Sequence, residues 1–133
     1  MISKWLISTR AAVLIMTFIS AALAGLFAWR DGSFSFIPWI ALVFGLIMAH
    51  ASNNIFNDYT DFVRGVDKDN YFRTQYGVHP LVQNFWTKSQ QIQWFVVSGI
   101  IATLSGMFAL FYTDFNPSVI ALFAFGALIL LFY

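Results

Sequence analysis

Apolar residues occupy four long runs along the chain, and most polar residues lie between them. The runs cover residues 11–29, 36–56, 92–112 and 119–133. A helix needs roughly 20 mainly apolar residues to cross the hydrocarbon core of a membrane. The first three runs reach that length and the fourth falls short of it. The pattern predicts an all-α fold, a polytopic bundle of about four transmembrane helices in one domain, residues 1–133.

The connections between the runs differ in length. Residues 30–33 and 113–118 are short and rich in glycine, proline, aspartate and asparagine, which indicates turns between antiparallel helices. The remaining connection, residues 57–91, is long and carries most of the charge. Because the fourth run is short and lacks a polar end, we expect the chain to be the amino-terminal part of a longer protein.

Basic residues indicate how the bundle is oriented, because lysine and arginine in short loops stay on the cytoplasmic side. All but Arg30 lie before the first run or in the long connection: Lys4, Arg10, Arg64, Lys68, Arg73 and Lys88. We therefore expect a multi-pass inner-membrane protein with a cytoplasmic amino terminus and 57–91 loop. The first run could instead be a signal peptide cleaved near residues 22–24, but its full spanning length favours a retained helix.

Composition agrees with a chain surrounded by lipid. Hydrophobic residues make up 59% and charged residues 10%, whereas a soluble domain has about 25% charged residues. A net charge of +1 without a basic stripe makes nucleic acid an unsuitable partner. Because there is no cysteine, a metal would have to bind oxygen atoms or the imidazoles of His50 and His79.

The segment NNIFNDYTD, residues 53–61, adds amides and carboxylates to the end of the second run. If the helix continues through this segment, residues three, four and seven apart share one face. The residues on that face are His50, Asn54, Asn57, Asp58 and Asp61, and Asn53 lies off it. Hydrocarbon cannot satisfy such groups, so the stripe should face a bundle interior or a wet cavity.

Neighbouring carboxylates repel one another unless they share a cation. Carboxylate and amide oxygens favour Mg²⁺, which usually takes one or two carboxylates together with phosphate oxygens of a substrate. Arg64, Lys68 and Arg73 follow the stripe and could bind the phosphate groups. Two simpler interpretations stay open: polar residues can mark a membrane boundary, and His50 can serve as a hydrogen-bonding group between helices.

The longer segment NNIFNDYTDFVRGVD, residues 53–67, resembles the first aspartate-rich motif of the UbiA superfamily of intramembrane prenyltransferases. The similarity lies at Asn54, Asp58, Asp61 and Asp67. Together with Asn57 and Gly65, the spacing is most similar to the branch that prenylates 1,4-dihydroxy-2-naphthoate for menaquinone. The resemblance implies that this chain is half of a nine-helix bundle, with a second aspartate-rich motif in a missing carboxy-terminal half.

The resemblance also implies a reaction and a set of roles. The enzyme would use Mg²⁺ to transfer a prenyl group from a polyprenyl diphosphate to an aromatic acceptor, and this half alone would be inactive. Asp58 and Asp61 would be catalytic. The implied metal ligands are Asn54, Asp58, Asp61 and Asp67, and the implied diphosphate ligands are Lys68, Arg73 and Arg64. His50, Asn57 and Tyr59 would contact the acceptor or support the metal ligands.

Other classes of function fit the sequence less well. A CDP-alcohol phosphotransferase needs an Asp-Gly pair, but here Tyr59 follows Asp58 and Phe62 follows Asp61. A cation path should remain polar across the membrane, but residues 36–49 are almost entirely apolar. A cation-binding module without such a path, or a non-catalytic membrane fragment that only packs against a partner, also remains compatible with the sequence.

Overall fold

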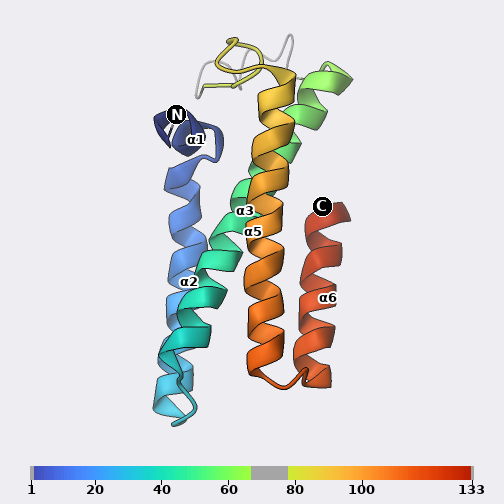
Figure 1. Cartoon of the computed structure of the whole chain (residues 1–133). Helices are drawn as coiled ribbons and strands as arrows, with labels where there is room; N and C mark the ends of the chain where they lie inside the picture. The colour runs from blue at the N-terminus through green and yellow to red at the C-terminus, as the bar shows by residue number, and fades with distance from the viewer. Residues whose placement is uncertain (1, 67–77, 133) are drawn as a thin grey trace.

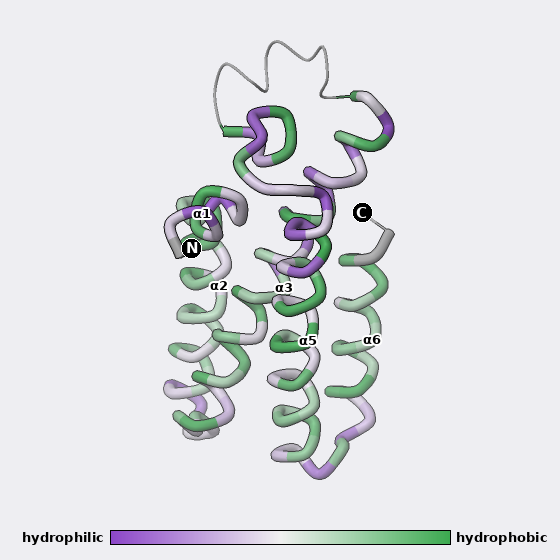
Figure 2. Tube along the Cα trace, turned by 45° about the horizontal axis from the view of Figure 1, so that its top comes forward, coloured by the Kyte–Doolittle hydropathy of each residue, from purple (hydrophilic) through white to green (hydrophobic). Residues whose placement is uncertain are grey.

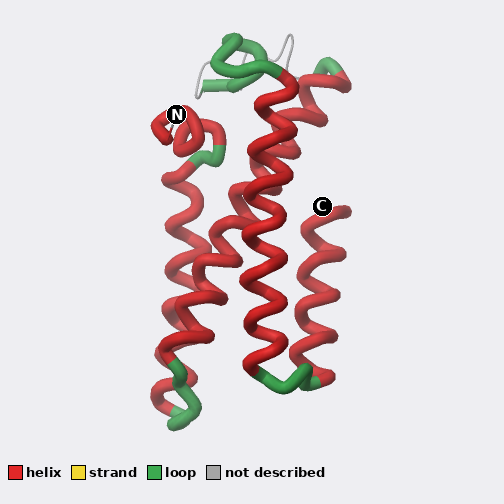
Figure 3. Tube along the Cα trace, viewed as in Figure 1, coloured by secondary structure: helices red, strands yellow, loops and turns green. Residues whose placement is uncertain are grey.

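Helices account for the ordered elements of the chain, and the computed structural model describes residues 2–66 and 78–132 (Figures 1 and 3). No strand occurs within these ranges. The helices are α1 (Ile2–Ser8), α2 (Ala11–Arg30), α3 (Phe36–Arg64), α5 (Lys88–Tyr112) and α6 (Pro117–Phe132). The all-α prediction is confirmed.

Three helices, α2, α3 and α5, are long and apolar enough to cross a membrane. The fourth expected span, α6, is apolar but has only 16 residues. In Figure 1 these four helices run side by side, with the α2–α3 and α5–α6 connections at one end and α1 at the other. The chain is therefore an integral membrane protein, whereas the membrane face on which each end lies stays a prediction.

The helix limits next to the long connection differ from those predicted. Helix α3 starts at Phe36 as expected but continues through the polar segment to Arg64, and Gly65 then ends it in the left-handed conformation, with φ 79°. Helix α5 starts at Lys88 because Thr87 and Gln90 form a capping box. Residues 57–64 and 88–91 of the predicted connection are thus helical.

A short segment before the first span, which includes Lys4, also forms a helix, α1, which the hydropathy pattern did not predict. It has seven residues, so its own backbone hydrogen bonds contribute little stability. Contact with the loop before α5 helps to place it, since Lys4 Nζ donates a hydrogen bond of 3.1 Å to the carbonyl of Phe85.

Helix α3 is the central element and packs against α2 on one side and α5 on the other. Gly45 allows α3 to approach α5 closely, because a Cβ atom at this position would lie 2.7 Å from Cβ of Ser105. On the α2 side, the indole of Trp39 covers Gly25 and donates a hydrogen bond of 3.0 Å to the carbonyl of Ala21. These contacts fix the three helices relative to one another.

Polar residues gather at the end of the bundle that carries α1 (Figure 2). We call this region the polar end, and it consists of residues 2–10, 50–66 and 78–91. The rest of α2, α3 and α5 is mainly apolar, apart from the short connections at the opposite end. The segment singled out from the sequence therefore lies where α1, α3 and the start of α5 meet.

Candidate functional site at the polar end

An ion pair with a buried carboxylate joins the start of α2 to α3. Arg10 Nη2 lies 2.6 Å from Asp58 Oδ1, and the Asp58 side chain is only 1% exposed. Removing a carboxylate from water is costly unless a cation and hydrogen bonds compensate. Arg10 meets Asp58 from a left-handed backbone conformation, with φ 54°, which few residues other than glycine adopt. The turn between α1 and α2 thus positions a guanidinium group over the α3 carboxylate.

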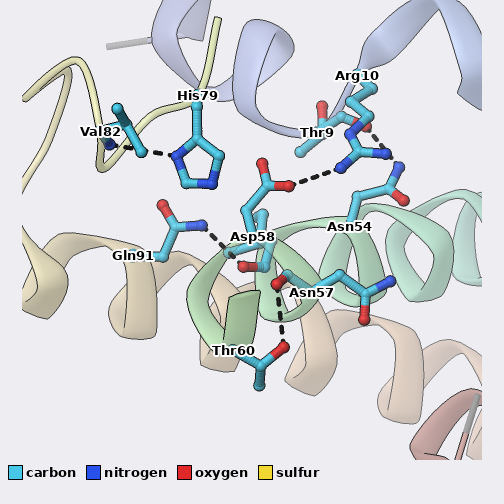
Figure 4. A network of polar contacts seen from close by, with 10 residues as sticks. Thr9, Arg10, Asn54, Asn57, Asp58, Thr60, His79, Val82 and Gln91 are labelled. Atoms are coloured by element: carbon cyan, nitrogen blue, oxygen red, sulfur yellow. Dashed lines mark hydrogen bonds and ion pairs between the residues drawn. The ribbon is translucent and has the colours of Figure 1, made fainter. Parts of the chain in front are cut away.

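Asn54 lies one helical turn before Asp58 on α3 and is also buried. Its Nδ2 atom donates a hydrogen bond of 2.9 Å to the carbonyl of Thr9. This bond fixes the amide orientation and leaves Oδ1 as the remaining acceptor of the side chain. Two consecutive residues, Thr9 and Arg10, therefore orient two side chains of the α3 stripe (Figure 4).

Helix α5 and the loop before it contribute a second group of buried polar side chains. Gln91 is 0% exposed, and its Nε2 atom donates a hydrogen bond of 2.8 Å to the carbonyl of Ile55. His79 is also fully buried, and its Nδ1 atom accepts a hydrogen bond of 3.2 Å from the backbone N–H of Val82. An accepting Nδ1 places the ring hydrogen on Nε2. Figure 4 shows His79 and Gln91 on the same side of α3 as Asp58.

The other sequence-predicted residues of α3 are less buried. Asp61, Asn57 and Tyr59 are half-buried, and Arg64 is exposed at the last residue of the helix. The side chain of Asn57 points away from the Arg10–Asp58 pair in Figure 4, while its carbonyl accepts a hydrogen bond of 3.0 Å from Thr60 Oγ1.

His50 lies two helical turns before Asp58 and contacts α2. Its Nδ1 atom is 2.7 Å from the hydroxyl of Thr17, and both side chains are half-buried. The predicted residues Asp67, Lys68 and Arg73 lie outside the described residues. The structure thus brings Asn54 and Asp58 together in the interior, with Asp61 at the edge and His50 deeper in the bundle.

Sequence reasoning missed three residues of this site. Arg10 was assigned only to membrane orientation, and no role was given to Thr9 or Gln91. A basic residue directly before a span is an ordinary orientation signal, so nothing local marks Arg10 as a partner of Asp58. Gln91 offered a weak signal, because a polar amide one residue before an apolar run needs a partner if it is buried.

The donor set of α3 suits a hard cation. In residues 2–66 and 78–132, no three histidine, cysteine, aspartate or glutamate side chains gather as they would around a protein-only metal site. Asp58, Asp61 and Asn54 nevertheless supply carboxylate and amide oxygens on one helix face. Mg²⁺ needs only one or two protein carboxylates when waters and phosphate oxygens complete its shell. The residues therefore fit Mg²⁺ bound together with a phosphorylated ligand.

Comparison with known families identifies the wider group. Residues 18–133 match the sequence profile of the UbiA prenyltransferase family, which is most of the chain. The chain belongs to this family. UbiA proteins are membrane enzymes that transfer prenyl groups to aromatic acceptors, and they generally use Mg²⁺ through aspartate-rich motifs. Neither curated proteins nor solved structures give a match.

The UbiA match and the structural site overlap only in part. Asn54, Asp58 and Asp61 lie inside the matched range, whereas Thr9 and Arg10 precede it. The residues that orient the motif in this structure thus come from a segment that the family profile does not cover.

Proposed function

We propose that the polar end binds a polyprenyl diphosphate and that this chain supplies the first aspartate-rich motif for prenyl transfer. The acceptor would be an aromatic compound such as 1,4-dihydroxy-2-naphthoate, in quinone biosynthesis. The observation that carries the proposal is the Arg10–Asp58 ion pair beside Asn54, on the α3 face that resembles the first aspartate-rich motif of the UbiA superfamily.

The charges at this place suit a diphosphate. A leaving diphosphate is stabilised by fixed cations and by hydrogen-bond donors aimed at its oxygens. Arg10 has five N–H donors, and one of its terminal nitrogens lies against Asp58. The Arg10 side chain is 37% exposed, so part of its guanidinium is open to a ligand, whereas its buried Nε atom, which has no hydrogen-bond partner in the described part of the chain, is not. The guanidinium therefore has donor capacity beyond the ion pair, next to the proposed metal ligands.

Each residue would have a distinct task in the reaction. Asn54, Asp58 and Asp61, with Asp67 in support, would hold Mg²⁺, which when bound would neutralise the departing diphosphate. Arg10 keeps the Asp58 side chain in place and adds positive charge where negative charge develops. Arg64, Lys68 and Arg73 would bind the outer phosphate oxygens. Further helices of the protein would supply the opposite wall and a second aspartate-rich motif.

The prenyl chain would extend from the polar end along the apolar part of the bundle. Cleavage of its C–O bond leaves the electron pair on the diphosphate and an allylic cation at the first carbon. The acceptor ring then forms a C–C bond to that carbon and loses a proton. This sequence requires a site that excludes water from the cation.

The decisive experiment measures prenyl transfer in membranes that contain this chain together with the carboxy-terminal half that the proposal requires, with a polyprenyl diphosphate and a hydroxynaphthoate acceptor. We expect transfer to require Mg²⁺ and to fall at least about a hundredfold in Asp58→Asn and Asp61→Asn, because the charge of a metal ligand is lost. Asp31→Asn is the matched control, since Asp31 lies in the connection at the opposite end. Undiminished transfer in both site variants would refute the proposal.

A further inference from the structure

The Thr17–His50 contact is a polar pair at the inner limit of the polar end, where α2 and α3 become mainly apolar. His50 is the first ionisable residue along α3, and it lies eight positions before Asp58. With a rise of about 1.5 Å per residue, it lies roughly 12 Å deeper along the helix axis than Asp58 and roughly 6 Å deeper than Asn54. Ionisable side chains at this depth normally face a bundle interior or a ligand pathway.

The pair occupies only one of the two ring nitrogens of His50. Nδ1 lies 2.7 Å from Thr17 Oγ1. Nε2 makes no hydrogen bond to any residue that the structure describes. Nε2 is not among the buried atoms that lack a partner, so it is open to the surroundings of the described helices, where hydrocarbon alone could not satisfy it. The hydrogen bond between α2 and α3 accounts for the contact of Nδ1, but it gives Nε2 no partner.

Both tautomers of His50 can bind the same kind of group through Nε2. If the Thr17 hydroxyl donates to Nδ1, the ring hydrogen is on Nε2, which then acts as a donor. If Nδ1–H donates to Thr17 instead, Nε2 is an acceptor. A hydroxyl group can accept or donate, so it suits either state, whereas an ether oxygen suits only one. The pair therefore selects a hydroxyl partner.

The depth of His50 determines which part of the reaction it can reach. A diphosphate held at Asp58 and Asn54 would place the first carbon of the prenyl chain below it, toward His50. The acceptor ring must meet that carbon at the same level. We propose that His50 Nε2 binds a hydroxyl group of the aromatic acceptor. This inference rests on the proposed function and assigns the acceptor side of the same site.

Two substitutions separate the roles of the ring nitrogens. The asparagine amide has a nitrogen or oxygen at the distance of Nδ1 from the backbone, whereas the glutamine amide extends to the distance of Nε2. If Nε2 binds the acceptor, His50→Gln should keep the KM for the acceptor within about threefold of the wild-type value. His50→Asn should raise that KM roughly ten- to hundredfold, because a buried hydrogen bond to the substrate is lost. The KM for the prenyl diphosphate should not change in either variant.

A purely structural role predicts the opposite order. His50→Asn would preserve the bond to Thr17 and the acceptor KM, while His50→Gln would weaken both, and this result would overturn the inference. Thr17→Val removes the bond between helices but retains Nε2, so it should raise the acceptor KM less than His50→Asn does. A second measurement compares two acceptors on the same protein, so a loss of protein stability in a variant does not affect the result. The wild-type protein should prefer a hydroxylated acceptor over its O-methyl ether, and His50→Leu should lose this preference.

The outcomes for the two proposals are distinguishable. Wild-type membranes that release no diphosphate from the prenyl donor would overturn the proposed function and the inference together. Wild-type transfer combined with unchanged acceptor KM values in His50→Asn and His50→Leu would overturn the role of His50 alone.

Discussion

Arg10 and Asp58 are 48 residues apart in the sequence, but their side chains meet at 2.6 Å in the structure. The contact joins the segment before the first span to the motif at the end of the second. It also compensates the charge of a carboxylate that is almost fully withdrawn from solvent. The stability of the polar end and the binding of a charged ligand should therefore both depend on Arg10.

Replacement of Arg10 by glutamine should destabilise the protein by about 1–3 kcal/mol, because Asp58 would stay buried without its cation. We place the value below that of a fully buried pair, since the Arg10 side chain is 37% exposed. Thermal unfolding of the purified protein in detergent measures the effect. The matched control is Arg30→Gln, whose ion pair with Asp31 is exposed and should contribute less than about 1 kcal/mol. Equal effects of the two substitutions would contradict this account.

Because α3 packs closely on α5, even an alanine side chain at Gly45 should destabilise the protein. In Gly45→Ala, the new methyl group would lie 2.7 Å from Cβ of Ser105, so one helix must move. We expect a loss of about 1–3 kcal/mol of unfolding free energy, which is usual for an overpacked contact. Gly126→Ala is the control, because a Cβ atom there has no atom within 4 Å. The prediction fails if both variants unfold at the same temperature.

Gln91 should contribute less to stability than its burial suggests. Its Nε2 atom has a hydrogen bond, but its Oε1 atom is buried and has no partner in the described structure. Gln91→Leu removes the favourable bond and the unsatisfied acceptor together, so unfolding free energy should change by less than about 1 kcal/mol. Gln93→Leu, at an exposed position on the same helix, is the control. A loss above about 2 kcal/mol only at Gln91 would show that Oε1 has a partner.

The start of α5 should depend on its cap. Thr87 Oγ1 accepts a hydrogen bond of 3.2 Å from Gln90 N, and Gln90 Oε1 accepts one of 2.9 Å from Thr87 N. Thr87→Ala should lower stability by about 1 kcal/mol, the usual cost of losing such a cap. Thr113→Ala makes the same change at the other end of α5, where the hydroxyl donates to carbonyls of its own helix. A larger loss at Thr113 than at Thr87 would argue against the cap.

The spans could be predicted because hydropathy is a local property. Helix α2 and the end of α5 match the predicted runs closely, because polar residues that a membrane excludes lie there. The polar end could be predicted only in part. Helical spacing placed Asn54, Asp58 and Asp61 on one face, but it cannot show which of them are buried or what contacts them.

The residues that contact the α3 motif from other helices could not be predicted from the spacing of residues along the sequence. Arg10 and Gln91 contact α3 only because three helices pack together, and neither contact follows from spacing along one helix. By contrast, the sequence does mark the start of α5, although hydropathy alone does not reveal it. The Thr87 and Gln90 pair is a capping box, and it would have moved the predicted start of the helix from residue 92 to 88.

Four polar contacts described above join the first long helix, or the turn before it, to α3: Arg10 with Asp58, Thr9 with Asn54, Thr17 with His50, and Ala21 with Trp39. Every participant lies within the first 58 residues, so these bonds can form before α5 has been synthesised. Chains emerge from the ribosome in order, and early segments can fold as units. The hairpin of α2 and α3 can thus enter the bilayer with the Asp58 carboxylate already paired with Arg10. Helix α5 then packs against a hairpin whose own polar contacts have formed.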